Sequence, residues 1–231
     1  MKLHLPVRLF KSVLACLAAM ASFTVGSGVA WADAQDLTFS GATLTWNTAE
    51  DNKAFVDAED AAASFAEGDN VSFTATSEVS LGEDITAGVV AIESGADVTI
   101  DLGAYTLEAE KMVLSGTLDM GGSFTVGSGD TLEIAAAGAV LDSALVMQEK
   151  GWLHLDAAVN LNTNDLTLSG KSGLILTATG DGRVYDLVTG ISALKDAAGN
   201  AINLDSSNNA IANYFDTTLP GSGFWADGIL Q

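Results

Sequence analysis

Apolar and polar residues alternate with a period of two in five stretches of the chain: 71–81, 97–104, 111–120, 123–134 and 151–161. Such alternation is typical of β-strands, in which successive side chains point to opposite faces, so that one face of each strand is buried. The pattern therefore predicts an all-β domain. In the stretch 151–161 it places two sets of residues on opposite faces: Leu153, Leu155, Ala157, Val159 and Leu161 inside, and Trp152, His154, Asp156 and Asn160 outside.

The predicted strands are short and are separated at close intervals by Gly, Asn or Asp, which adopt the positive φ angles that tight turns need. An imperfect phrase, an apolar-x-apolar strand ending in Ser-Gly, recurs as Leu37-Thr-Phe-Ser-Gly41, Met112-Val-Leu-Ser-Gly116 and Leu166-Thr-Leu-Ser-Gly170. Repeated strand–turn units without intervening helices favour a β-solenoid, in which each coil stacks on the next. A β-sandwich is the alternative.

Two segments do not follow the strand pattern. Residues 54–66 are rich in Ala and acidic residues, with Phe55, Ala58, Ala62 and Phe65 near helical spacing, which predicts a short helix or a long loop. Residues 191–216 are rich in Asn, Ala and Asp and end in an aromatic pair, Tyr214-Phe215; a second pair, Phe224-Trp225, follows. Because the open ends of a solenoid must be covered, both segments are expected to be caps. The expected division is an N-terminal strand and acidic cap at 33–70, solenoid coils at 71–190, and a C-terminal cap or truncated coil at 191–231.

The first 32 residues have the features of a secretory signal peptide. Lys2, Arg8 and Lys11 form a basic region, and residues 12–29 carry no charge. Two overlapping small-x-small sites follow, Ala30-Trp-Ala32 and Ala32-Asp-Ala34, so cleavage after Ala32 or after Ala34 is expected. The uncharged run contains Ser, Thr and Gly and is too short and polar for a membrane span. A lipoprotein-type cleavage before Cys16 is disfavoured, because Lys11 leaves too short an apolar stretch ahead of it.

The remaining chain is strongly acidic: it keeps all 30 acidic residues but only six basic ones, a net charge near −24. Such a charge repels nucleic acid and anionic lipid headgroups. After cleavage the chain also contains no cysteine and therefore no disulfide bond.

Few residues are available for catalysis after the signal segment, where His154 is the single histidine and Arg183 the single arginine. His154 is predicted to be an exposed surface residue. A pair of carboxylates is the catalytic alternative, as in glycoside hydrolysis. Asp97 and Asp101 share a strand face, but four residues of strand separate them by ~13 Å.

Two oxygen-rich turns, Asn160–Asp165 and Asp181–Asp186, have the ligand type that calcium prefers, but neither has a recognised calcium-binding spacing. Trp152, Tyr105 and Tyr185 are candidates for stacking on sugar rings, and each is equally well explained as a packing or turn residue. The sequence predicts no catalytic, cofactor-binding or metal-ligating residue.

Three phrases resemble the autotransporter-associated β-strand repeat of Gram-negative passenger proteins: Thr45-Trp-Asn47, Phe65-Ala-Glu-Gly-Asp-Asn-Val-Ser-Phe73 and Val79-Ser-Leu-Gly-Glu-Asp-Ile-Thr-Ala-Gly88. The resemblance covers about residues 37–120. It implies a single-stranded, right-handed parallel β-helix at or beyond the outer membrane. A translocator barrel, with its alternating segments of ~10 residues, is not expected in this chain, which ends at Gly228-Ile-Leu-Gln231, so a periplasmic location is the other expectation.

Together these observations predict an exported, non-enzymatic β-solenoid with a structural or surface-interaction role, adhesive in character. An extracellular glycan or a surface protein is the expected kind of partner. The alternative is a carbohydrate-active enzyme that uses paired carboxylates.

Overall fold

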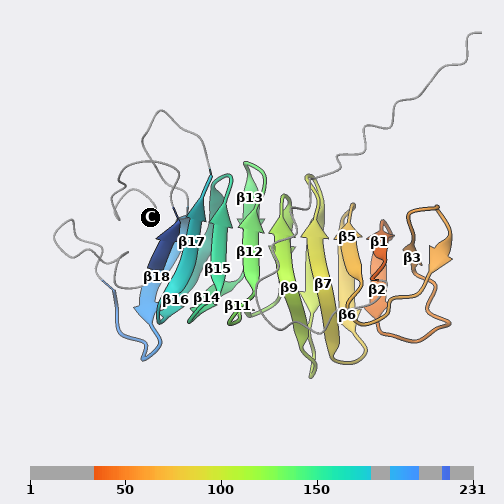
Figure 1. Ribbon diagram of the computed structural model, residues 1–231, viewed down its shortest axis with the longest axis horizontal. Helices are drawn as coiled ribbons and strands as arrows, with labels where there is room; N and C mark the ends of the chain where they lie inside the picture. The colour runs from red at the N-terminus through yellow and green to blue at the C-terminus, as the bar shows by residue number, and fades with distance from the viewer. Residues whose placement is uncertain (1–33, 178–187, 203–214, 219–231) are drawn as a thin grey trace, which may run out of the picture. The chain divides into compact units, whose positions relative to one another are not determined.

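The computed structural model describes residues 34–177, 188–202 and 215–218 (Figure 1). This part of the chain is entirely β-structure and contains no helix. The strands of the first half are β1 (Asp36–Phe39), β2 (Thr43–Trp46), β3 (Phe55–Val56), β4 (Ala62–Ala63), β5 (Asn70–Phe73), β6 (Ser77–Leu81), β7 (Ile85–Ile92), β8 (Asp97–Asp101), β9 (Leu107–Leu114) and β10 (Thr117–Asp119). Those of the second half are β11 (Ser123–Val126), β12 (Thr131–Ile134), β13 (Ala139–Leu141), β14 (Ala144–Gln148), β15 (Trp152–Leu155), β16 (Val159–Ser169), β17 (Ser172–Leu176), β18 (Val188–Asp196) and β19 (Phe215–Thr218).

The strands form two sheets by stacking successive coils in register. One sheet has the order β19-β17-β15-β12-β9-β7-β5-β1-β3-β4, and the other has the order β11-β14-β16-β13-β10-β8-β6-β2. Every pairing between coils is parallel, as in Val90 with Met112 and Leu132 with Leu153. In Figure 1 the coils follow one another in sequence order from β1 to β18. This parallel stacking identifies the β-solenoid and excludes the antiparallel sandwich.

The path of the chain within a coil changes along the solenoid: the long strand β16 takes part in two ladders. Its first residues pair with β13, and Leu166–Ser169 pair with β14. Between these parts the backbone turns at Asn162 and Thr163, whose φ angles are 47° and 66°. From β11 onward each coil therefore contributes strands to a third ladder, which the alternation alone did not predict.

The core lies between the sheets and is built by the inward-facing apolar residues of each strand. Leu153, Leu155, Val159 and Leu161 are buried as predicted. Ala157 is only partly buried, because β15 ends at Leu155 and the next strand begins at Val159. The predicted run 151–161 is thus two strands joined at a corner.

Buried serine side chains form hydrogen bonds with backbone groups at several of the corners. Ser77 donates its hydroxyl to the carbonyl of Gly41 at 2.8 Å, and Ser172 donates to the carbonyl of Gln148 at 2.9 Å. The hydroxyl oxygen of Ser143 accepts the N–H of Met120 at 2.8 Å. Each bond joins one coil to the preceding one, so polar groups inside the corners remain paired.

The segment 54–66 is an antiparallel hairpin, not the expected helix or long loop. β3 pairs with β1 and β4 pairs with β3, both antiparallel, so the hairpin extends the sheet beyond the first coil. The near-helical spacing of its apolar residues was misleading. Phe55 and Phe65 come from opposite sides of the hairpin, and both are buried against Trp46 of β2. The chain reverses within 57–61, where the carboxylate of Asp57 accepts the backbone N–H of Ala61 at 2.8 Å.

At the C-terminal side, β18 continues through residues 191–196, the start of the segment expected to be a cap or a truncated coil. It pairs in parallel with β16, and the chain then turns back so that Ile202 donates to the carbonyl of Leu194 at 2.9 Å. The aromatic residues Tyr214 and Phe224-Trp225 lie outside the described residues, as does the signal segment 1–33.

Candidate functional site

Among the strands that the structure describes, β2 is the last one of its sheet, and its outer edge borders a groove. Leu44 and Trp46 point inward, while Thr43 and Thr45 are exposed. Toward β6, the carbonyls of Ala42 and Trp46 accept backbone N–H groups. Because parallel pairing uses alternate residues, the backbone groups of Thr43 and Thr45 face the opposite, open side. A free sheet edge of this kind is a place where an extended chain can bind.

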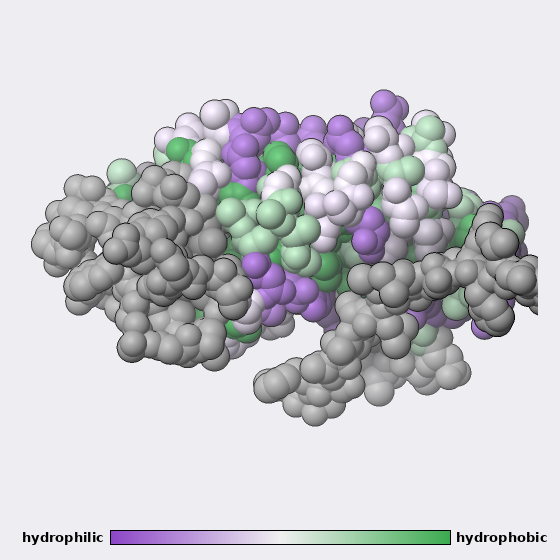
Figure 2. Space-filling model, turned by 90° about the horizontal axis from the view of Figure 1, so that it is seen from above, coloured by the Kyte–Doolittle hydropathy of each residue, from purple (hydrophilic) through white to green (hydrophobic). Residues whose placement is uncertain are grey.

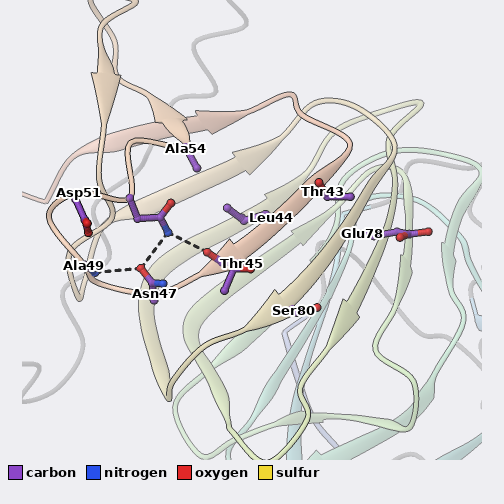
Figure 3. A pocket seen from close by; sticks show the side chains of 10 residues that line it. Thr43, Leu44, Thr45, Asn47, Ala49, Asp51, Ala54, Glu78 and Ser80 are labelled. Atoms are coloured by element: carbon purple, nitrogen blue, oxygen red, sulfur yellow. Dashed lines mark hydrogen bonds between the residues drawn. The ribbon is translucent and has the colours of Figure 1, made fainter.

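The groove has a volume of about 620 Å³ and is bounded by β2, the outer face of β6 and the loop that follows β2 (Figure 3). Its lining residues are Thr43, Leu44, Thr45, Asn47, Ala49, Asp51, Asn52, Ala54, Glu78 and Ser80. The side-chain amide of Asn52 donates to the carbonyl of Thr45 at 2.9 Å and to Oδ1 of Asn47 at 3.0 Å. These bonds fold the loop back over one end of the β2 edge and form one wall of the groove.

The lining is polar and acidic. It presents hydroxyl groups, side-chain amides and the carboxylates of Asp51 and Glu78, and none of the lining residues is basic. Beside it, the hydroxyl and the backbone N–H of Thr48 donate to Glu83, which lowers the pKa of that carboxyl below its ordinary value. The groove therefore favours a neutral ligand rich in hydrogen-bonding groups or a cationic one.

A second polar feature is a charged row on the outer face of the other sheet. Nζ of Lys111 lies 2.7 Å from Oε2 of Glu133, and the same oxygen lies 3.1 Å from Nδ1 of His154. Nε2 of His154 lies 3.0 Å from Oδ1 of Asp156. The row thus crosses three successive coils. His154 is on the outer face as predicted, but its side chain is only 21% exposed.

This geometry limits what His154 can do chemically. Both ring nitrogens of His154 lie against carboxylates, and Nε2 also lies 3.3 Å from the hydroxyl oxygen of Thr177, so neighbouring side chains occupy the polar edge of the ring. His154 thereby connects Glu133 of β12 with Asp156, which directly follows β15.

Trp152 lies on the same outer face, two residues before His154. It pairs in the ladder with Gly173 of the next coil, and its indole ring covers the space that a Cβ at position 173 would occupy. Trp152 is half-buried as a result, and Gly173 is buried beneath it. The glycine is therefore explained by the close approach of this ring. Tyr105, another candidate for sugar stacking, is 41% exposed and follows β8 in a turn.

The stacking does not bring a second carboxylate opposite Asp97 or Asp101. Both are exposed on β8, where Asp97 pairs with Thr117 and Asp101 pairs with Ser80. The ladder neighbours are hydroxyl side chains, and Oδ1 of Asp101 accepts the N–H of Gly103 at 3.0 Å.

In the turn Asn160–Asp165, one of the two oxygen-rich turns considered for calcium, protein groups bind the side-chain oxygens of the first and last residues. Oδ1 of Asn160 accepts the N–H of Asn162 at 2.9 Å, and Asp165 forms an ion pair with Lys195 of β18. Within the part of the chain that the structure describes, no group of three or more acidic, His or Cys side chains is placed to hold a metal ion. The other oxygen-rich turn, Asp181–Asp186 with Tyr185, lies outside the described residues.

One acidic residue outside the groove, Asp130, has surroundings that raise the pKa of its carboxyl. Burial raises the pKa of Asp130, and the carboxylates of Glu108 and Glu110 on β9 raise it further, against the lowering effect of the N–H of Gly127. These surroundings disfavour the ionised form of Asp130.

The alternation pattern did not reveal the groove, because its wall is a loop that the sequence assigned only to an acidic cap. The signal that was present is the pair Asn47 and Asn52, since side-chain amides of this kind often bond to nearby backbone. Which strand is the last of a sheet follows only from the three-dimensional pairing.

Comparison with known proteins gives no relative: no family model, no curated protein and no solved structure matches this chain. Among the described residues there is no helix long and apolar enough to cross a membrane.

Proposed function

We propose that this chain is an exported, non-enzymatic β-solenoid with a structural or surface-interaction role, adhesive in character, of the kind formed by autotransporter passenger proteins of Gram-negative bacteria. The N-terminal segment supports export, because it combines a basic start, an uncharged stretch and small-x-small cleavage sites. The repeat-like phrases between Leu37 and Met120 support the likeness to passenger proteins. The cell surface or the extracellular space is the proposed location, with the periplasm as the other possibility.

The observation that carries the interaction role is the groove along the free edge of β2. It combines backbone groups that face away from β6 with hydroxyl, amide and carboxylate side chains, which is the chemistry that an extended polar partner requires. The outer faces of the solenoid add polar rows in register, and Figure 2 shows hydrophilic residues interspersed with small apolar patches on one face. An extracellular glycan or a segment of a surface protein is the partner that this lining fits.

A binding screen with product analysis tests this proposal. The purified mature chain is exposed to mucin-type and plant-type glycans and to proteins released from cell surfaces, and bound material and reaction products are both measured. Binding without turnover is expected. Release of shortened glycans would contradict the non-enzymatic role and support the carboxylate-pair enzyme.

Variants of the groove make the test specific to the site. Asp51→Lys and Glu78→Lys reverse the two charges of the lining and are expected to weaken binding of a neutral or cationic ligand. Asp97→Lys makes the same charge change on an exposed position of β8, outside the groove, and is expected to leave binding unchanged. An equal effect of all three would place the contact elsewhere. Fractionation of the producing cells tests export, and retention of the uncleaved chain inside the cell would contradict it.

A further inference from the structure

The carboxylate of Asp69 is buried next to the segment where the signal peptide is expected to end. Asp69 is only 3% exposed. Its Oδ1 accepts the backbone N–H of Gln35 at 2.8 Å, and its Oδ2 accepts the backbone N–H of Ala66 at 2.8 Å. In the described part of the chain, no Lys, Arg or His side chain forms an ion pair with this carboxylate.

A buried carboxylate held only by neutral donors is costly compared with one that also faces a positive charge. Of the two backbone nitrogens that donate to Asp69, the nitrogen of Gln35 is the one that signal cleavage could make positively charged. Gln35 immediately follows Ala34, the last residue of the second small-x-small site, Ala32-Asp-Ala34. Cleavage at this site would therefore turn the amide nitrogen that Asp69 already binds into a chain terminus.

We propose that signal cleavage occurs after Ala34 and that the new α-ammonium group of Gln35 forms an ion pair with the buried carboxylate of Asp69. Hydrolysis of the Ala34–Gln35 peptide bond consumes one water molecule, leaves a carboxylate on Ala34 and frees an amine on Gln35. That amine is mostly protonated at neutral pH. Cleavage after Ala32 would leave two further residues and keep a neutral amide at Gln35.

The surrounding contacts hold the new terminus in place. The carbonyl of Gln35 accepts the N–H of Asn70 at 2.8 Å. From Asp36 to Phe39, β1 is paired in register with β5, beginning at Asp36 with Asn70. The side-chain amide of Asn70 also donates to Asp36 at 2.8 Å, and its Oδ1 accepts the N–H of Val89. The start of β1 is therefore bonded to the second coil, and Asn70 bonds the second coil to the third. The ion pair forms on this fixed segment, so maturation stabilises the first coil.

This proposal depends on the export proposed above, and the first experiment separates the two. The exported protein is purified, and its intact mass and N-terminal sequence are determined. A chain that begins at Gln35 with a free amine is expected. A chain that begins at Asp33 overturns this proposal and leaves export intact, whereas a chain that retains residues 1–32 overturns both. A cyclised N-terminal glutamine, lighter by one ammonia, has lost the charge and overturns the ion pair.

The second experiment measures the ion pair directly. Thermal unfolding is compared for three chains: one that begins at Gln35, the same chain acetylated at its α-amine, and one extended by Ala34. The free Gln35 chain is expected to melt about 3 °C or more above the other two. Asp69→Asn is expected to remove this difference, because the partner charge is gone. Equal melting temperatures for the three chains with Asp69 intact would overturn the proposal.

Discussion

At the residue scale, the direction of each side chain follows from its place in the alternation and from where the coil turns. Leu153 and Leu155 are fully buried and His154 points outward, as the period of two predicts. Ala157 deviates because residues 156–158 form a corner, where the alternation no longer applies. Sequence pattern alone could therefore assign the strands but not the corners between them.

The register of β15 can be tested by placing a charge on either face. Leu155→Asp puts an unpaired carboxylate into the core and is expected to lower the free energy of unfolding by ~3 kcal/mol or more. His154→Gln, one position away, loses only partly exposed contacts with Glu133 and Asp156 and is expected to cost about 1 kcal/mol or less. Denaturant titration measures both. Similar small effects would mean that β15 is not part of a packed core.

His154→Asp is expected to destabilise the protein more than an ordinary surface substitution. The new carboxylate would face Glu133 and Asp156, the two groups that His154 now joins. Its cost should exceed that of His154→Gln because like charges are brought together.

Gly173 is expected to be intolerant of even a methyl group. In Gly173→Ala the Cβ would overlap the indole ring of Trp152, so the ring must leave its position on the sheet. We expect a loss of about 1–3 kcal/mol, the range for overpacking, and a red shift of tryptophan fluorescence that is absent in a Trp152→Phe background. Gly122→Ala is the control, because nothing lies within 4 Å of a Cβ there. A stable, unshifted Gly173→Ala would contradict the packing of Trp152 on this glycine.

Asp130 gives a pH-dependent prediction. Because burial raises its pKa in the folded state, the ionised carboxyl destabilises the fold at neutral pH, and this cost disappears as pH falls through the raised pKa toward the ordinary value of 3.8. Asp130→Asn is therefore expected to be more stable than the wild type at neutral pH. The difference should shrink on acidification, as measured by denaturant titration between neutral pH and pH ~4. A variant that is less stable at neutral pH would contradict the assignment.

At the scale of elements, the N-terminal hairpin shows how a local pattern can mislead. Helical spacing in 54–66 reflects aromatic residues that reach the same core from two strands of a hairpin. Phe55 contacts Phe39, Trp46 and Phe65, with ring centroids 5.9, 6.1 and 6.2 Å apart. The turn carried its own signal in Asp57, whose side chain accepts two backbone N–H groups, from Glu59 and Ala61.

Removing the ring at position 55 tests whether the hairpin closes the core. Phe55→Ala empties the centre of the aromatic cluster and is expected to cost about 3–5 kcal/mol. Val56→Ala, on the half-buried side of the same strand, is expected to cost about 1 kcal/mol. Denaturant titration with tryptophan fluorescence compares the two. Equal small losses would indicate that the hairpin does not pack on the first coil.

At the scale of the described solenoid, the repeated strand–turn pattern was sufficient to predict parallel stacking, because coils of similar length bring equivalent positions together. The third ladder and the free edge of β2 could not be predicted in the same way. Both depend on where β16 bends and on which strand is left without a partner, and these follow from pairing between residues distant in sequence. The candidate groove is therefore a product of the assembled coils.

Cysteine cross-linking between neighbouring coils tests the parallel register most directly. The chain after the signal segment contains no cysteine. Thr117 of β10 pairs with Asp97 of β8, whereas Thr99, two residues further along β8, pairs with Asp119. The variant with Thr117→Cys and Asp97→Cys is expected to oxidise to an intramolecular disulfide, because paired strands bring Cα atoms within the range of about 4.4–6.8 Å that a disulfide spans. The variant with Thr117→Cys and Thr99→Cys is expected to stay reduced under the same conditions. A disulfide in the second variant and none in the first would contradict the parallel solenoid.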